Sequence, residues 1–300
     1  MDMTQNKCCR YGTNLRRRRR RRRKILRSII FSCSIIAVAV FVAVGSRMIT
    51  SGDGGTNRYD VEAGNNTYDN AVIENSKISE KNKIQNNQSM LDDIMNSTQY
   101  PKQLKDLALK NEEALEFVYD YPAEHVKEHT IDLTEEASMD SVPLFVQWDK
   151  RWGYEKYSGN FFAASGCGPT TLSMVVVYLT HNREASPIAV AKYSKEAGYS
   201  VDGSGSSWTL ISEGCMHYGV KAKAVALDES RMKAELDEGH PIVVNVGPGD
   251  FTDTGHFMVI TGYDDEGFSI NDPNSIEKSG KRWLFKNISS QIRAVWSMYV

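Results

Sequence analysis

Eight consecutive arginines, residues 16–23, stand shortly before a run of nineteen residues without a charge, residues 28–46. A helix of about 20 apolar residues, each rising ~1.5 Å, matches the roughly 30 Å hydrocarbon core of a bilayer. Cationic flanks stay on the cytoplasmic side of a membrane. The pattern predicts a basic cytoplasmic tail over residues 1–27 and a single transmembrane anchor over residues 28–46, with everything that follows outside the cytoplasm.

A cleaved signal peptide is the alternative for this segment, because the small residues Ala-Val-Gly at 43–45 suit a signal peptidase. Nucleic-acid binding by the arginines is disfavoured by the charge of the rest of the chain. Residues 1–27 hold 12 of the 36 Lys and Arg and one of the 38 Asp and Glu, which leaves 24 basic and 37 acidic residues, a net charge of −13. A part this acidic is poorly suited to a polyanionic partner.

The rest of the chain divides by composition. Residues 47–100 are rich in Asn, Ser, Gly and Asp without a sustained apolar period, which predicts a flexible, disordered linker. Residues 101–141 open with apolar residues at helical spacing, which predicts an amphipathic helix ending near Pro122, as a helical preface. Residues 142–300 are long enough to bury a full core and form the predicted main domain.

The main domain has its helical patterns first and its strand patterns second, the order typical of an α+β fold. We expect helices over residues 168–180, from Pro187 to Gly198, and from Ser206 or Ser207 to Gly219. Strands are expected in "KAKAVAL", "PIVVNV", "HFMVITGY" and "GFSIND", with a short helix between Asp228 and Gly239.

Cys167 is the candidate nucleophile. The stretch "SGCGPTTLSM" places it at the start of an apolar helix, where the partial positive charge of the N-terminus lowers a thiol pKa. Gly166 and Gly168 permit close approach of backbone and substrate, and Pro169 suits a first helical turn. A small residue packed at a helix start is the alternative. Cys215, by contrast, is expected in the core, unbridged to Cys167.

His256 is the candidate base, because it opens a predicted strand that turns at residues 264–267 and returns to residues 271–272. Around such a hairpin, Asp272 can reach the imidazole and hold its tautomer, as the third member of a nucleophile-base arrangement. Asn271 should face the other way, since strand side chains alternate. A slip of one residue in the register would exchange the two, so Asn271 stays the alternative.

"VPLFVQWDKRWG", "SGCGPTTLSM" and "GHFMVITGYDDEGFSINDP", in this order, resemble the papain-like cysteine peptidases of family thirty-nine, in the broader family thirty-nine-like form of Gram-positive bacteria. The resemblance covers residues 142–300 and implies a papain-like fold with a helical lobe and an antiparallel sheet lobe. It implies Cys167 as nucleophile, His256 as base, Asp272 as orienting acid and Gln147 as a side-chain donor to the oxyanion. Gln147 lies twenty residues before the cysteine, farther than in the bacteriocin-processing (double-glycine leader) peptidases of this family, so a structural amide is its alternative.

Together, the predicted anchor and the resemblance imply a membrane-anchored, extracytoplasmic cysteine peptidase that acts on peptide or protein, and no cofactor or metal is expected. A catalytically idle binding module on a tether, and an acyl transferase or amidase for cell-wall peptide, are the alternatives. "HVKEH" at 125–129 matches a metallopeptidase motif but lacks an apolar helix face around it. The loop over residues 247–255 is a candidate rim of the cleft or a plain connector, and Trp148, Trp152 and Trp208 line a groove or fill the core.

Overall fold

The computed structural model describes residues 66–300, with side chains from residue 79 onward. The predicted tail, the predicted anchor and the first part of the predicted linker lie outside the described residues. The segment Asn70–Val300 forms one compact unit. Of the helices in this part of the chain, none is both long and apolar enough to cross a membrane.

The segment before the main domain is a succession of helices. In chain order they are α2 (Asn66–Asn96), α3 (Lys102–Lys110), the 3-10 helix η1 (Glu112–Ala114), α4 (Leu115–Tyr119), α5 (Tyr121–Glu124) and α6 (Thr134–Ser138). The expectation of a flexible linker up to residue 100 is therefore wrong from residue 66 onward. The polar composition concealed three apolar residues at helical spacing, Met90, Leu91 and Ile94, which pack against the helices that follow.

The single amphipathic helix expected to end near Pro122 is also wrong. The chain leaves the helix at Asn111, whose φ of −135° is extended. The Asn111 side chain then accepts a hydrogen bond from the backbone N–H of Glu113 and starts η1. The break turns the segment back on itself, so that α3 and α4 bury their apolar faces in one cluster with Phe161 and Ala163 of the main domain.

The helical lobe follows. Its elements are β1 (Lys156–Tyr157), β2 (Asn160–Phe161), α7 (Phe162–Ser165), α8 (Cys167–Thr180), α9 (Pro187–Glu196), β3 (Ser200–Val201), β4 (Gly205–Ser206), α10 (Thr209–Ser212) and η2 (Gly214–Tyr218). The expected first two helices are confirmed. The third is divided, because β4 takes Ser206 and a short break separates α10 from η2, which ends at Gly219 with φ +73° as expected.

The sheet lobe completes the domain. Its elements are β5 (Lys221–Ala224), α11 (Glu229–Asp237), β6 (Ile242–Val246), β7 (His256–Asp264), β8 (Gly267–Asn271), α12 (Ile276–Ser279), β9 (Arg282–Trp283), α13 (Phe285–Ile288), η3 (Ser289–Gln291) and β10 (Ile292–Tyr299). The six strands form one antiparallel sheet in the order β5-β10-β6-β7-β8-β9. The four predicted strands are therefore confirmed, and the architecture is the predicted α+β.

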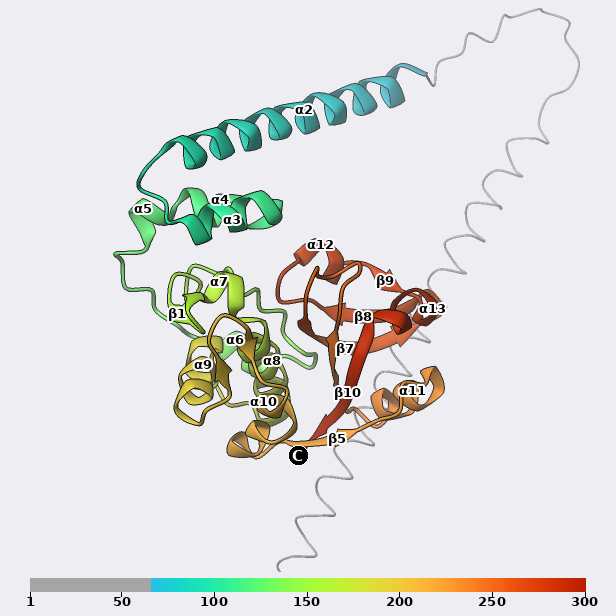
Figure 1. Cartoon of the computed structure of the whole chain (residues 1–300). Helices are drawn as coiled ribbons and strands as arrows, with labels where there is room; N and C mark the ends of the chain where they lie inside the picture. Colours follow the sequence, from blue (N-terminus) through green and yellow to red (C-terminus); the bar gives the residue numbers. More distant parts are fainter. Residues whose placement is uncertain (1–65) are drawn as a thin grey trace, which may run out of the picture. The chain divides into compact units, whose positions relative to one another are not determined.

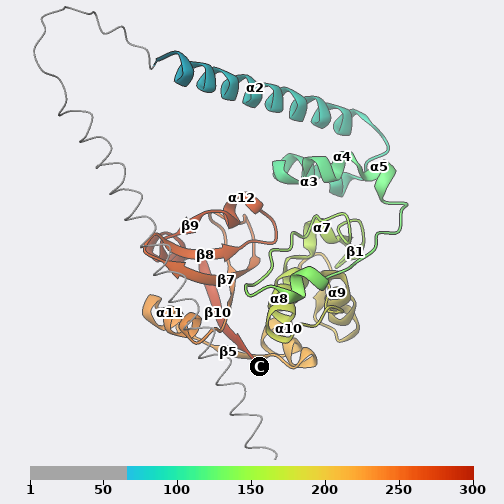
Figure 2. The ribbon, with the colours of Figure 1, turned by 180° about the vertical axis from the view of Figure 1, so that it is seen from behind.

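The sheet is buried on both faces. Val243 on β6 and Val259 on β7 join the cluster that surrounds α8, whereas Val244 and Ile260 point to the opposite cluster with Met232 of α11. Alternate residues of a strand face opposite sides, so continuous apolar runs are what a doubly covered sheet requires. Helices α8, α9 and α10 lie on one side and strands β7, β8 and β10 on the other, as both views show (Figure 1, Figure 2).

Candidate active site

Cys167 is the first residue of α8, whose following residues from Gly168 to Val177 are all buried. Two glycines make this placement possible. A Cβ at Gly166 would lie 2.6 Å from the ring of Phe162, and a Cβ at Gly168 would lie 2.6 Å from the Oγ of Ser206. The helix start therefore packs closely against α7 and β4, while Cys167 itself remains partly exposed.

The helix is joined to the sheet beside the cysteine. Thr171, one turn into α8, donates a hydrogen bond from its Oγ1 to the carbonyl of Phe257, 3.0 Å away, and both residues are buried. Phe257 follows His256 directly on β7. This bond holds the start of α8 against the start of β7, so Cys167 and His256 line the same cavity.

His256 is held from its other side by Asp272. The His256 Nε2 lies 2.7 Å from the Asp272 Oδ1, and both side chains are buried. A carboxylate accepts hydrogen bonds, so Nε2 carries the proton and Nδ1 is left to face Cys167. The same Oδ1 also accepts the backbone N–H of Asn274 at 2.8 Å. The structure therefore brings together the three residues Cys167, His256 and Asp272 that the sequence singled out.

A β-bulge decides which residue reaches the histidine. Between the turn and Gly262 the hairpin pairs Tyr263 with Phe268, but beyond the irregularity at Ile260/Gly262 it pairs Val259 with Asn271. Without that extra residue, Asn271 would share the face of His256. With it, Asn271 points away and donates its Nδ2 to the carbonyls of Val142 and Pro143 at 3.1 and 3.0 Å. The expectation that Asp272 and Asn271 face opposite ways agrees with this geometry.

The electrostatics of the pair are coupled. Burial works to raise the pKa of the Cys167 thiol, but the hydrogen bond and positive charge of His256 prevail and hold that pKa below its ordinary value. Burial works to lower the pKa of His256, but the charge and hydrogen bond of Asp272, followed by those of Cys167, raise it to about 10. Both shifts favour one state, a thiolate paired with an imidazolium, which is the reactive form of a cysteine.

Gln147 lies in the same cleft, and its side chain is buried. Its Nε2 donates to the Ala163 carbonyl at 2.7 Å and to the Asn274 Oδ1 at 3.3 Å, while its Oε1 has no hydrogen-bond partner. One of its N–H groups is thus firmly engaged and the other only weakly. This arrangement agrees with a structural role for the Gln147 amide, and it also leaves the weakly bonded N–H able to turn toward a ligand.

Asn274 is a residue of the site that the sequence analysis did not single out. Its backbone N–H bonds Asp272, its side-chain oxygen accepts from Gln147, and its carbonyl accepts the Nε1 of Trp148 at 3.3 Å. Only its position two residues after Asp272 in "NDPN" could have indicated it. Trp148 therefore borders the site, whereas Trp152 is buried in the core.

Two cavities meet at Cys167. One, of about 630 Å³, lies along the turn between β3 and β4, and its lining includes Trp208, Asn245 and Arg293. The other, of about 480 Å³, extends past His256 and Gln147 to α3. The loop over residues 247–255 contributes to the lining of both, which confirms it as a rim of the cleft. A chain-like ligand that occupied both cavities would cross the thiol.

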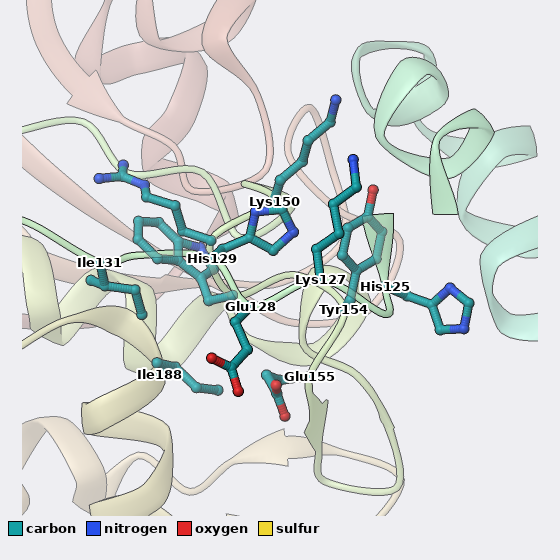
Figure 3. Close-up of a pocket in the computed structure, with 11 residues that line it drawn as sticks. His125, Lys127, Glu128, His129, Ile131, Lys150, Tyr154, Glu155 and Ile188 are labelled. Atoms are coloured by element: carbon teal, nitrogen blue, oxygen red, sulfur yellow. The ribbon is translucent and has the colours of Figure 1, made fainter. Parts of the chain in front are cut away.

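A separate pocket of about 360 Å³ contains the "HVKEH" residues His125 and His129 (Figure 3). The segment is a turn here, not a helix, and the His125 ring stacks on Tyr121, away from His129. Within residues 79–300, no group of three or more His, Cys, Asp or Glu could hold a metal ion. The bases beside this pocket are paired with acids, as Lys150 is with Asp120 at 2.6 Å.

Cys215 differs from Cys167 in its surroundings. It is a free cysteine, fully buried in the helical lobe, as the sequence analysis expected. Burial, with no compensating cation, raises its pKa to about 11. Of the two described cysteines, Cys167 has a lowered thiol pKa and Cys215 a raised one.

A papain-type α+β fold with a cysteine at a helix start, opposite a histidine on the sheet, defines the class of cysteine peptidases. More narrowly, the chain belongs to the Peptidase C39-like family, whose sequence profile matches residues 139–300, more than half of the chain. Membership of a peptidase family implies that its substrate is a peptide.

Two solved structures are similar to the chain. The peptidase domain of Streptococcus ComA, a bifunctional ABC transporter involved in a quorum-sensing pathway, is 19% identical, with a TM-score of 0.39 over 53% of this chain and 96% of that one. A C39-like peptidase from Bacillus anthracis is 16% identical, with a TM-score of 0.34 over 53% of this chain and 95% of that one. No curated protein matches the sequence.

Proposed function

We propose that the chain is an active cysteine peptidase that hydrolyses peptide bonds through a covalent acyl-enzyme, with Cys167 as nucleophile, His256 as acid and base, and Asp272 as the acid that orients His256. The observation that carries this proposal is the buried hydrogen bond between His256 and Asp272, with His256 and Cys167 lining the same cavity. A binding module without catalysis gains nothing from an ionised, partly exposed thiol beside an imidazolium.

In the first half of the reaction, the Cys167 thiolate attacks the carbonyl carbon of the peptide bond and forms a C–S bond. The carbonyl oxygen takes the electron pair and becomes an oxyanion. The Nδ1 proton of the His256 imidazolium then passes to the leaving nitrogen, the C–N bond breaks, and the thioester remains. Asp272 keeps the imidazole oriented throughout because it holds the Nε2 proton.

In the second half, the neutral Nδ1 of His256 takes a proton from water, and the resulting hydroxide oxygen attacks the thioester carbonyl. The C–S bond breaks, the carboxylic acid product leaves, and the thiolate and imidazolium are restored. The two cavities on either side of Cys167 give the substrate a path across the thiol. An amine in place of water would give acyl transfer by the same steps.

The oxyanion needs donors. The backbone N–H of Cys167 is one, since the first N–H groups of a helix have no partner in the preceding turn. We assign the second to the Gln147 Nε2, through the N–H that now makes the long contact of 3.3 Å with Asn274. Removal of an oxyanion donor typically lowers kcat by about 10²–10³-fold.

The test is turnover by the purified full-length chain on reduced casein, with the products identified by mass spectrometry. We expect peptides to accumulate with the native chain and not with Cys167→Ala or His256→Ala. His217→Ala is the matched control, since His217 is exposed, stacks on Tyr193 and lines neither of the cavities at Cys167. Cleavage by Cys167→Ala equal to that of the native chain would contradict the proposal.

The location of the enzyme is a second part of the proposal. The arginine block and the uncharged run favour an anchored chain with the catalytic domain outside the cytoplasm. Protease treatment of intact cells should then digest an epitope placed after Val300, and the mature chain should retain its first residues. A mature N-terminus shortly after residue 45 would instead indicate a secreted enzyme, and an epitope protected until lysis would contradict export.

A further inference from the structure

The helices before the family domain contact the loop that carries Asp272. This segment ends before residue 139, where the family match begins. Asn111, between α3 and η1, donates its Nδ2 to the Asn274 carbonyl at 2.9 Å and to the Asn274 Oδ1 at 3.1 Å. These are contacts between residues 163 positions apart. They fix the residue whose backbone N–H holds the carboxylate of Asp272.

Glu113 makes a second set of contacts two residues later. Its Oε2 accepts the backbone N–H groups of Ile276 and Glu277 at 2.7 and 3.1 Å, and its Oε1 accepts the hydroxyl of Ser275. Those N–H groups lie at the start of α12, where a helix has no internal acceptors for them. One carboxylate thus satisfies three consecutive donors of the loop over residues 272–277.

The main domain also holds the loop, since the Pro273 carbonyl accepts the backbone N–H of Gln147 at 2.7 Å and Asn274 accepts from the side chains of Gln147 and Trp148. Strand β8 ends at Asn271, so Asp272 lies just beyond the regular ladder, with an isolated bridge to Ser275. Within the loop, the Ser279 Oγ accepts the N–H of Asp272 at 2.9 Å. Asn111 and Glu113 therefore supply most of the side-chain hydrogen bonds that reach the loop from another part of the chain.

The same helical segment also borders the cleft. The cavity of about 480 Å³ that contains Cys167 and His256 is lined on this side by four residues of α3, namely Gln103, Asp106, Leu107 and Lys110. Asp250 and Asp253 of the 247–255 loop line it as well. Both views place α12, which follows the Asp272 loop, next to α3 and α4 (Figure 1, Figure 2).

We propose that Asn111 and Glu113 are positioning residues of the active site: they hold the loop over residues 272–277 in the place where Asp272 can bond His256. The helical segment is then a working part of the peptidase, and α3 forms one side of its substrate cleft. This inference rests on the proposed function, because it assigns residues to the same site. It extends that site beyond the 139–300 family domain.

The consequence of losing these contacts is chemical. A loop free to move carries Asp272 away from His256, the imidazolium loses its main stabilising charge, and the thiolate of Cys167 takes up a proton. The charged or titratable groups near His256 are Asp272, Cys167 and, beside Cys167, Tyr157. Those along the cavity are Asp106, Lys110, Asp250, Asp253 and Lys278. None of these is changed by the substitutions below.

The experiment measures alkylation of Cys167 by iodoacetamide in the full-length chain, read from the tryptic peptide of residues 157–183, which contains no other cysteine. The quantity is the rate at pH 6 divided by the rate at pH 10, because an ordinary thiol of pKa about 8.5 is ionised only at the higher pH. We expect Glu113→Ala and Asn111→Ala each to lower this ratio about tenfold or more, the equivalent of one pKa unit.

Two further variants separate positioning from general stability. Glu113→Gln keeps an acceptor oxygen for the N–H groups of Ile276 and Glu277, so we expect it to restore most of the ratio. Glu112→Ala is the matched control, because Glu112 is an adjacent glutamate that accepts from Asn87 of α2 and does not contact the loop. We expect its ratio to equal that of the native chain.

An unchanged ratio in Glu113→Ala and Asn111→Ala, with both variants folded, would overturn the inference, as would an equal loss in Glu112→Ala. If Glu113→Ala loses its thermal transition, Asn111→Ala decides by the same ratio. A native chain whose Cys167 is unreactive at pH 6 is a different outcome: it refutes the proposed function itself and with it any positioning role. If only the positioning role is wrong, the native chain has a high ratio and the Glu113→Ala and Asn111→Ala variants have the same ratio.

Discussion

The Nε2 of His256 lies 2.7 Å from the Oδ1 of Asp272, and the two residues are only 5% and 0% exposed. A charged pair this deeply buried is stable only when each member is held by a partner, since leaving one ion alone in the interior costs several kcal/mol. The partners here are Cys167, which raises the pKa of His256, and the backbone N–H of Asn274, which Asp272 accepts. In the proposed function, the pair acts as one unit with Cys167.

Replacing either of two neighbouring residues tests this relationship. We expect Asp272→Ala to lower kcat by about 10²-fold or more, because the imidazolium loses the charge that stabilises and orients it. Asn271→Ala removes two hydrogen bonds to the 142–143 backbone, at about 1 kcal/mol each, and should lower the free energy of unfolding while leaving kcat within a few fold. Equal losses of kcat would show that the bulge does not separate the two roles.

The pH dependence of acylation follows from the two pKa shifts. The thiolate is present above the lowered pKa of Cys167, so the rate falls as the pH drops through that value. The imidazolium that protonates the leaving group persists up to the raised pKa of His256, about 10, so the rate falls again above it. A bell-shaped profile of kcat/KM whose plateau covers neutral pH is expected, and a rate that rises steadily to pH 9 would contradict the ion pair.

Gly168→Ala tests the close packing at the start of α8. Alanine inside a helix normally stabilises it by about 1 kcal/mol relative to glycine. Here the new Cβ would lie 2.6 Å from the Ser206 Oγ, so we expect the opposite, a loss of about 1–3 kcal/mol in the free energy of unfolding. Gly255→Ala is the matched control, since nothing lies within 4 Å of its Cβ position and little change is expected. Urea denaturation measures both.

Thr171→Val tests the bond that holds α8 beside β7. The substitution keeps the volume but removes the buried hydrogen bond to the Phe257 carbonyl, and we expect a loss of about 1–3 kcal/mol in the free energy of unfolding. The pairing of Cys167 with His256 should weaken too, with slower alkylation at pH 6. Thr180→Val removes a part-buried bond to Val176 within the same helix and a long contact of 3.3 Å with the Asn182 N–H, so it should cost less than about 1 kcal/mol and leave alkylation unchanged.

Much of the main domain could be predicted from sequence because its signals are local. Local sequence patterns are enough to predict three features of it. These are the apolar helix after Cys167, the cap at Ser186 that accepts the Ala189 N–H, and the strands before and after residues 264–267. The approach of residues 271–272 to His256 also followed from the length of one hairpin, with Asp272 and Asn271 left as alternatives. The family resemblance stated on those motifs agrees with the match over residues 139–300.

What the sequence could not supply depends on contacts between distant residues. The β-bulge between Ile260 and Gly262 leaves no mark in an alternating apolar pattern, although it decides whether Asp272 or Asn271 faces the histidine. The helix over Asn66–Asn96 has the polar composition of a linker, because Met90, Leu91 and Ile94 find their partners only in the folded segment around Leu104. Asn111 and Glu113 carry no sequence pattern that separates them from surface residues, because their partners in the loop after β8 lie more than 160 positions away.

The central claim is that Cys167 rests as a thiolate paired with His256, and the pH dependence of its alkylation measures this directly. Cys215, in the tryptic peptide of residues 196–221, serves as the internal control, because burial raises its pKa to about 11. We predict that iodoacetamide labels Cys167 rapidly at pH 6 while Cys215 stays unlabelled, and that His256→Ala returns Cys167 to an ordinary thiol titrating near about pH 8.5. A native Cys167 that already titrates near that value, unaffected by His256→Ala, would contradict the account.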